Sequence, residues 1–111
     1  MEDLKPFAVK MEKDQARQRL LGHLSDTVGL KSGQVILKPG EEVGEHNTEN
    51  KEEVIVILEG EAEITSDKSG PVSAKKNSAA YIPPHTSHNV RNTGKSPLRY
   101  VYIVSLIVKE E

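Results

Sequence analysis

From Gln34 onward, short segments rich in β-branched residues recur about every 8–12 residues, and turn signals separate them. Pro39-Gly40 is one such signal, and the polar run from Asp67 to Gly70 is another. This spacing is typical of an all-β sandwich or barrel. The expected strands are residues 34–38, 44–48, 53–58, 61–66, 72–74, 79–82, 88–91 and 98–108.

The first third of the chain is patterned less clearly. Residues 7–9 are expected to form a short edge strand, and residues 26–33, which contain two glycines, are expected to form a loop. Residues 15–24 fit either a short helix or a strand. Gly22 favours the strand, because glycine in a helix interior costs about 1 kcal/mol.

The chain of 111 residues has the size of one ordinary domain, and it shows no repeated block, low-complexity segment or linker. We therefore expect a single domain over residues 1–111. Its core barrel is expected at about 30–108, preceded by an N-terminal strand segment at 1–29.

In two of the expected strands, residues 54–58 and most of residues 98–108 are apolar on both faces. An antiparallel sheet with one face in water should alternate between apolar and polar residues, so these strands need a cover on their outer face. Either a packed N-terminal segment or a partner subunit supplies that cover. We favour a homodimer, because an uncovered apolar patch of this kind favours association.

Composition argues against several classes of protein. The net charge is −2, aromatic residues make up 4%, and no stripe of Lys and Arg is interleaved with aromatics, so no nucleic-acid partner is expected. The absence of cysteine excludes a disulfide framework, a thiolate zinc site and a cysteine nucleophile. Residues 1–14 lack the apolar core of a signal peptide, and no apolar run approaches the roughly 20 residues of a membrane span. We expect a cytoplasmic protein with no membrane partner.

Potential metal ligands are concentrated in one stretch and in one distant position. His46, Thr48 and Glu53 lie within eight positions, and alternation along a strand points His46 and Thr48 to the same face. An antiparallel barrel can bring them to His88. Two imidazoles and one carboxylate form a site with open positions, of the type associated with non-haem iron and also suited to zinc, manganese or nickel. The alternative is that His46 is a polar surface residue and that Glu53, beside Glu52, is an ordinary solvated charge.

The same stretch resembles the first motif of the cupin family, G-x5-H-x-H-x3,4-E-x6-G. Gly40, His46, Glu53 and Gly60 match it, and Thr48 stands where the family has its second histidine.

The second cupin motif, G-x5-P-x-G-x2-H-x3-N, resembles the stretch that begins at Asn77. Pro83, His88 and Asn92 match in register, whereas Asn77 and His85 replace the two glycines.

The resemblance implies a jelly roll, also called a double-stranded β-helix, of six to eight strands. It implies that His46, Glu53 and His88 bind a metal ion and that Thr48 occupies the fourth ligand position. A neutral hydroxyl is a poor ligand beside an imidazole, so this site is expected to bind metal more weakly or to hold an extra water.

The two remaining histidines are less constrained. His85 lies in the turn before His88, where it either caps the turn, faces solvent or approaches the metal from the side. His23 lies outside both motifs and is interpreted as structural or exposed.

Other residues are expected to line the interior because they share the parity of Glu53 or His88 along their strands. They are Ile55, Ile57 and Val90. Three tyrosines either orient a polar ligand through the hydroxyl or simply pack: Tyr81, Tyr100 and Tyr102.

Four arginines are candidates to hold a carboxylate substrate: Arg17, Arg19, Arg91 and Arg99. Arg91 and Arg99 are discounted, because both have the wrong parity to face the interior.

Two functions remain open. The first is a metal-dependent enzyme acting on a small molecule, for which the resemblance implies a dioxygenase, an isomerase or a decarboxylase. The second is a non-catalytic small-molecule-binding module with weak or no metal. The substitution at Thr48 and the lack of an identifiable general base favour the second, and no catalytic residue can be named.

Overall fold

The computed structural model of the protein describes residues 4–22 and 26–106, which form nine strands and no helix. In chain order the strands are β1 (Arg17–Leu21), β2 (Leu30–Leu37), β3 (His46–Asn47), β4 (Lys51–Glu59), β5 (Glu61–Ser66), β6 (Val72–Lys75), β7 (Ala79–Ile82), β8 (Ser87–Arg91) and β9 (Leu98–Leu106). No helix in the described part of the chain is long and apolar enough to cross a membrane.

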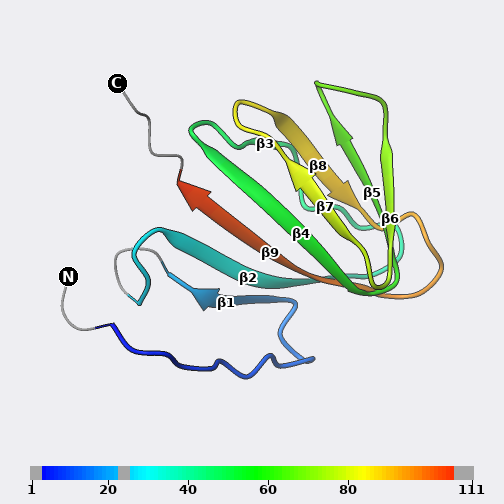
Figure 1. The fold of residues 1–111 in the computed structure, drawn as a ribbon. Helices are drawn as coiled ribbons and strands as arrows, with labels where there is room; N and C mark the ends of the chain where they lie inside the picture. Colours follow the sequence, from blue (N-terminus) through cyan, green and yellow to red (C-terminus); the bar gives the residue numbers. More distant parts are fainter. Residues whose placement is uncertain (1–3, 23–25, 107–111) are drawn as a thin grey trace.

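The strands form two antiparallel sheets, one of order β1-β2-β9-β4-β7 and one of order β3-β8-β5-β6. The chain passes repeatedly from one sheet to the other, as Figure 1 shows for the path from β2 through β3 to β4. Two facing antiparallel sheets with these crossings are the jelly-roll, or double-stranded β-helix, fold that the motifs implied.

The core lies between the sheets and is built from alternate residues of each strand. Ile55 and Ile57 on β4 are buried, as their parity with Glu53 predicted, and Val90 on β8 is buried with His88. Each such aliphatic side chain contributes about 1.5–3 kcal/mol by its removal from water. The core residues are Val35, Leu37, Ile55, Ile57, Ala62, Ile64, Ala74, Ile82, Val90, Leu98 and Tyr100.

The expected loop at residues 26–33 is wrong in its second half, because β2 begins at Leu30. Gly33 is a strand residue, and its missing side chain leaves room for an aromatic ring. A Cβ at Gly33 would lie 2.5 Å from the hydroxyl oxygen of Tyr102 on β9. This glycine therefore serves packing rather than a turn.

The N-terminal segment is divided between one strand and an irregular stretch. β1 confirms the strand that Gly22 favoured for residues 15–24. The edge strand expected at residues 7–9 is wrong, since these residues are exposed and pair with no strand of residues 4–22 and 26–106. His23 and the final residues of the strand expected at 98–108 lie outside the described residues.

Hydrogen bonds from side-chain amides, and not strand pairing, hold this irregular stretch against the fold. Gln34 donates to the carbonyl of Glu12 at 2.7 Å, and Gln18 donates to the carbonyl of Lys10 at 2.9 Å. Because Gln34 lies on the outer face of β2, the stretch covers part of that face. Figure 1 shows it, in dark blue, running outside the space between the two sheets.

The outer face of β4 and β9 keeps the apolar character that the sequence predicted. Val54 pairs with Ile103, and Val56 pairs with Val101. Val54 is 37% exposed, so the N-terminal stretch does not fully cover this patch. We call these four residues the outer valine–isoleucine patch.

Candidate metal centre

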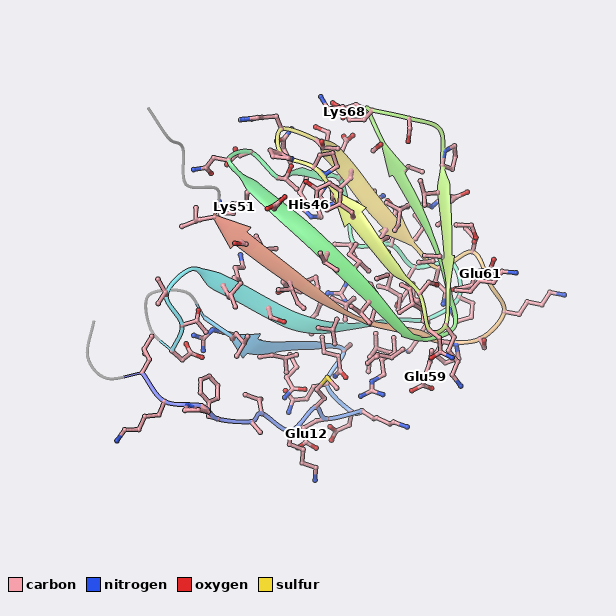
Figure 2. All side chains as sticks on the ribbon, viewed as in Figure 1. Glu12, His46, Lys51, Glu59, Glu61 and Lys68 are labelled. Atoms are coloured by element: carbon pink, nitrogen blue, oxygen red, sulfur yellow. The ribbon has the colours of Figure 1, made fainter. Side chains whose placement is uncertain are left out.

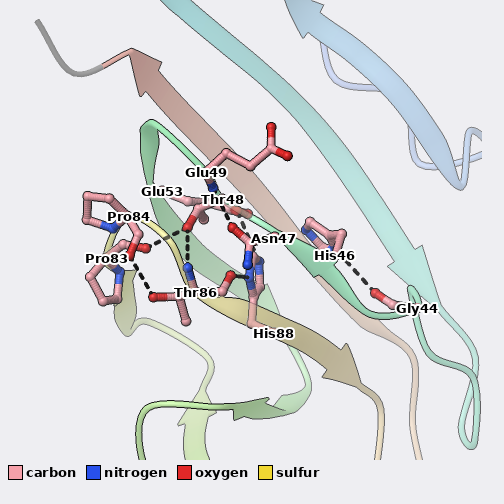
Figure 3. A network of polar contacts seen from close by, with 10 residues as sticks. All are labelled: Gly44, His46, Asn47, Thr48, Glu49, Glu53, Pro83, Pro84, Thr86 and His88. Atoms are coloured by element: carbon pink, nitrogen blue, oxygen red, sulfur yellow. Dashed lines mark hydrogen bonds and ion pairs between the residues drawn. The ribbon is translucent and has the colours of Figure 1, made fainter.

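The two histidines of the predicted site face each other across one strand pair. β3 has only two residues, and it owes its position to β8, against which His46 pairs directly with His88. Their ring centroids are 4.1 Å apart. Figure 3 shows both rings near the short connection between β3 and β4.

Each imidazole is oriented by a backbone carbonyl. Nδ1 of His46 lies 3.1 Å from the carbonyl oxygen of Gly44, and Nδ1 of His88 lies 3.2 Å from that of Thr86. A carbonyl only accepts, so Nδ1 is the donor in both contacts. In the neutral ring Nε2 then carries a free electron pair, which is the state that binds a metal ion.

Glu53 brings a carboxylate from the other sheet to the same point. Its Oε1 lies 3.2 Å from Nε2 of His88, within ion-pair distance. This fully buried Nε2 has no hydrogen-bond partner of good geometry in the described residues, so the two atoms are close but not aligned for a hydrogen bond. A buried polar atom left without a partner costs about 1–3 kcal/mol, so a cation there would relieve a cost that the fold otherwise carries.

Protonation of His88 reflects the same surroundings. Burial lowers the pKa of His88, but the Glu53 carboxylate and the Thr86 carbonyl together raise it by more. The pKa therefore lies above its ordinary value, because a positive charge is favoured between these groups.

The three donors meet the requirements of a metal site. The ligand atoms of His46, Glu53 and His88 all lie within 4.8 Å of one another, and among the described residues no other three His, Cys, Asp or Glu side chains form such a group. His46 is exposed, so its ring can adjust to an ion. Two imidazoles and one carboxylate suit a divalent transition metal.

Thr48 makes hydrogen bonds that the sequence did not reveal. Its hydroxyl donates to the carbonyl of Pro83 at 2.7 Å and accepts from the backbone N–H of Thr86 at 3.0 Å. Figure 3 shows both bonds, which tie the connection before β4 to the turn before β8. Thr48 thus clamps two connections, and its role at a fourth ligand position stays a prediction.

The replaced glycines of the second motif have a common backbone conformation. Asn77 has a φ of 71° and His85 has a φ of 52°, both in the left-handed region that glycine favours. His85 is exposed and lies outside the group of three donors, in agreement with its interpretation as a turn residue. Gly40 and Gly60, the matching glycines of the first motif, have φ values of 87° and 85°.

A cavity of about 380 Å³ opens beside two of the three donors, His46 and Glu53, and His88 does not line it. Its wall includes His46, Glu53 and Thr48, together with the tyrosines at positions 100 and 102. The remaining residues around it are Arg17, Lys31, Val35, Val43, Asn47, Lys51, Val90 and Val104.

The structure separates the predicted interior residues. Tyr100, Tyr102 and Val90 line the cavity, whereas Ile55 and Ile57 lie in the core and do not. Tyr81 is exposed and donates its hydroxyl to Glu52 at 2.7 Å.

The four arginines also have different positions. Arg17 lines the cavity, and Arg19 contacts Asp26 outside it. The two arginines discounted on parity are indeed turned away from the cavity: Arg91 lies near Glu42 and Glu63, and Arg99 bonds to Gln34 and Glu59.

The lysines of the cavity were missed by sequence reasoning. Lys51 shares the parity of Glu53 along β4, so the signal for it was present. Lys31 was hidden because residues 26–33 looked like a loop.

Tyr100 presents an unusual hydroxyl to the cavity. The residue is 3% exposed, and no described residue makes a hydrogen bond to its hydroxyl. Burial, followed by the negative charge of Glu53, raises the pKa of Tyr100, so the phenol stays protonated at neutral pH. It is a hydrogen-bond donor without an acceptor in the described part of the chain.

Comparison with known sequences identifies related proteins. The chain is 33% identical over 98 residues to the uncharacterized protein MJ1618 of Methanocaldococcus jannaschii, which covers 86% of this chain and 75% of that protein. It is 29% identical over 114 residues to a Streptomyces cyaneus protein named polyketide synthase CurC, over 95% of this chain and 73% of that protein.

Comparison with solved structures gives the same fold at lower identity. BH2720 from Bacillus halodurans superposes with a TM-score of 0.79 and 21% identity, over 96% of this chain and 86% of that one. The cupin domain of Schizosaccharomyces pombe Cnp3 superposes with a TM-score of 0.73 and 20% identity, over 82% of this chain, which spans 64% of that domain's chain.

A family match completes the comparison. Residues 33–104 match the family described as Cupin domain, and this range contains both motifs and all three metal-ligand candidates. The match extends over more than half of the chain, so this protein belongs to the cupin family.

Proposed function

We propose that this protein binds one divalent transition-metal ion through His46, Glu53 and His88, and that the ion acts on a small molecule held in the adjacent cavity. The observation that supports the proposal is Nε2 of His88, which is buried against a carboxylate and has no hydrogen-bond partner among the described residues. Iron, manganese, zinc and nickel all suit this set of donors.

Three protein ligands would leave open coordination positions on a bound ion. At these positions the ion would act as a Lewis acid toward an oxygen atom of the bound molecule. The protein supplies the surroundings: valines on the cavity wall exclude water, and the Tyr100 hydroxyl donates a hydrogen bond. We propose a reaction of the isomerase, decarboxylase or dioxygenase type. The relative named polyketide synthase is compatible with a small organic substrate.

A non-catalytic binding module is the second candidate, and one observation favours it. Glu53 is the only carboxylate among the described residues that line the cavity, and the proposal uses it as a ligand. The Tyr100 phenol has a raised pKa and does not serve as a base at neutral pH. If the metal-loaded protein binds small molecules and releases them unchanged, the non-catalytic binding function is the correct one.

The metal content of the purified protein tests the first part of the proposal. Protein stripped with a chelator is supplemented separately with iron(II), manganese(II), zinc or nickel, and the bound metal is measured by mass spectrometry. We expect about one ion per chain for at least one metal. His46→Ala and His88→Ala should each release it, because removing one of three protein ligands leaves too few donors.

His85→Ala is the matched control, because it removes an exposed histidine three residues from His88. It should keep the metal. Sub-stoichiometric binding of all four metals by the unaltered protein would contradict the proposal, and so would full retention of metal by His88→Ala.

A further inference from the structure

The cavity concentrates positive charge in a chain whose net charge is −2. Arg17, Lys31 and Lys51 line it, and Glu53 is the only carboxylate among its described lining residues. None of the three cations forms an ion pair within the part of the chain that the structure describes. Charged walls of one sign around a concave surface attract ligands of the opposite sign.

Strand register places the cations around one side of the cavity. On the inward face, Arg17 pairs with Val35, which pairs in turn with Tyr100 on β9. In a second row Lys31 pairs with Val104, and Val104 pairs with Glu53 on β4. The backbones of Lys31 and Glu53 are therefore two strand spacings apart, which is roughly 10 Å between their Cα atoms.

Lys51 completes the group from the first position of β4. Figure 2 shows Lys51 on the same side of the molecule as His46, away from Glu59 at the other end of β4. The three cations thus come from three strands, β1, β2 and β4, of one sheet.

The space between the cations and the metal ligands is mostly apolar. Val35, Val43, Val90 and Val104 line it, together with the two tyrosine rings. At about 380 Å³ it lies near the lower end of small-molecule pockets. The Tyr100 residue is 3% exposed, and its hydroxyl has no acceptor there among the described residues.

From this arrangement we infer that the ligand of the cavity is a small organic carboxylate. Its carboxylate binds Lys31 and Lys51, which flank β9 from β2 and β4. Its apolar body, about the size of one ring, packs against the valines, and an oxygen at its far end accepts a hydrogen bond from Tyr100. This inference rests on the proposed function for the role of the metal, but the binding of the anion does not require the ion.

A carboxylate is favoured over a phosphate by the donors that are present. Phosphate sites commonly use backbone N–H groups at a helix N-terminus, and the described residues contain no helix.

Calorimetric titration of the chelator-stripped protein tests the inference with four probes: benzoate, 4-hydroxybenzoate, 4-hydroxybenzamide and phenyl phosphate. We expect 4-hydroxybenzoate to bind at least about tenfold more tightly than the neutral amide, since a charge-assisted contact is worth that much. We also expect it to bind more tightly than benzoate and phenyl phosphate. Its affinity should fall as salt is added, because salt screens the exposed cations.

Variants assign the contacts. Lys31→Gln and Lys51→Gln should each weaken the binding of 4-hydroxybenzoate by about tenfold and leave the binding of the amide unchanged. Tyr100→Phe should remove the advantage of 4-hydroxybenzoate over benzoate. Lys75→Gln, which removes an exposed lysine on β6, is the matched control and should change nothing. Circular dichroism shows that each variant has kept its fold.

Several results would overturn the inference. They are equal binding of the amide and the acid, tighter binding of phenyl phosphate, unchanged binding of 4-hydroxybenzoate by Lys31→Gln and Lys51→Gln, or no binding of either carboxylate at millimolar concentration. The metal proposal fails separately: a stripped protein that binds carboxylates but never takes up metal supports this inference and contradicts that proposal.

Discussion

His85 holds a conformation that costs an ordinary residue free energy. Its φ of 52° places Cβ close to the following carbonyl, at a position where the family motif has glycine. We expect His85→Gly to raise the free energy of unfolding by up to about 1 kcal/mol. That is the left-handed penalty of about 1–2 kcal/mol less the extra backbone entropy that glycine loses on folding.

Urea denaturation measures this gain, and His85→Ala separates it from loss of the imidazole. Alanine keeps the strained conformation, so His85→Ala should not be more stable than the unaltered protein. A variant with glycine that unfolds at lower urea would show that the imidazole stabilises the turn.

The Thr48 hydroxyl links two connections of the fold through two hydrogen bonds. Thr48→Val keeps the shape of the side chain and removes both hydrogen bonds, leaving the carbonyl of Pro83 and the N–H of Thr86 without this partner. We expect a loss of about 1–3 kcal/mol in the free energy of unfolding.

Thr65→Val on β5 is the control for that loss, because no hydrogen bond is described for its hydroxyl, and it should change stability little. If the Thr48 hydroxyl serves only the clamp, the metal content of Thr48→Val should equal that of the unaltered protein. Loss of metal with retained fold would instead show that the hydroxyl is a ligand.

At the scale of elements, alternation on a strand was the reliable guide. It predicted that Ile55 and Ile57 are buried on the side of Glu53, and it correctly turned Arg91 and Arg99 away from the cavity. The periodicity of a strand is local, so it can be read along the chain without knowing any partner.

The features that were missed depend on contacts between distant residues. Lys31 was assigned to a loop because Gly33 looks like a turn residue, whereas that glycine accommodates the ring of Tyr102. The hydrogen bonds of Thr48 cross 35 and 38 positions of sequence. The strand expected at residues 7–9 failed because side-chain amides of Gln18 and Gln34 hold the neighbouring backbone instead.

At the scale of the whole molecule, the outer valine–isoleucine patch remains to be explained. The irregular N-terminal stretch covers the neighbouring Gln34 but leaves Val54 partly exposed. We propose that a second copy of the chain covers the patch in a homodimer, since an exposed apolar patch on a sheet favours association.

Sedimentation equilibrium at micromolar concentration measures the assembly, and we expect the mass of a dimer. Val54→Lys should shift the equilibrium to monomer, because it places a charge in the patch. Val72→Lys, at an exposed valine on β6 in the other sheet, should not. A monomeric unaltered protein would contradict the homodimer.

The candidate ligands come from both layers of the fold: His46 and His88 from the four-stranded sheet, and Glu53 from the five-stranded sheet. An ion there would cross-link the two sheets and would hold the two-residue strand β3 against its neighbours. Since binding to the folded state alone adds to its stability, the melting temperature should climb with metal concentration. A thermal melt then becomes a direct gauge of occupancy that needs no knowledge of the reaction.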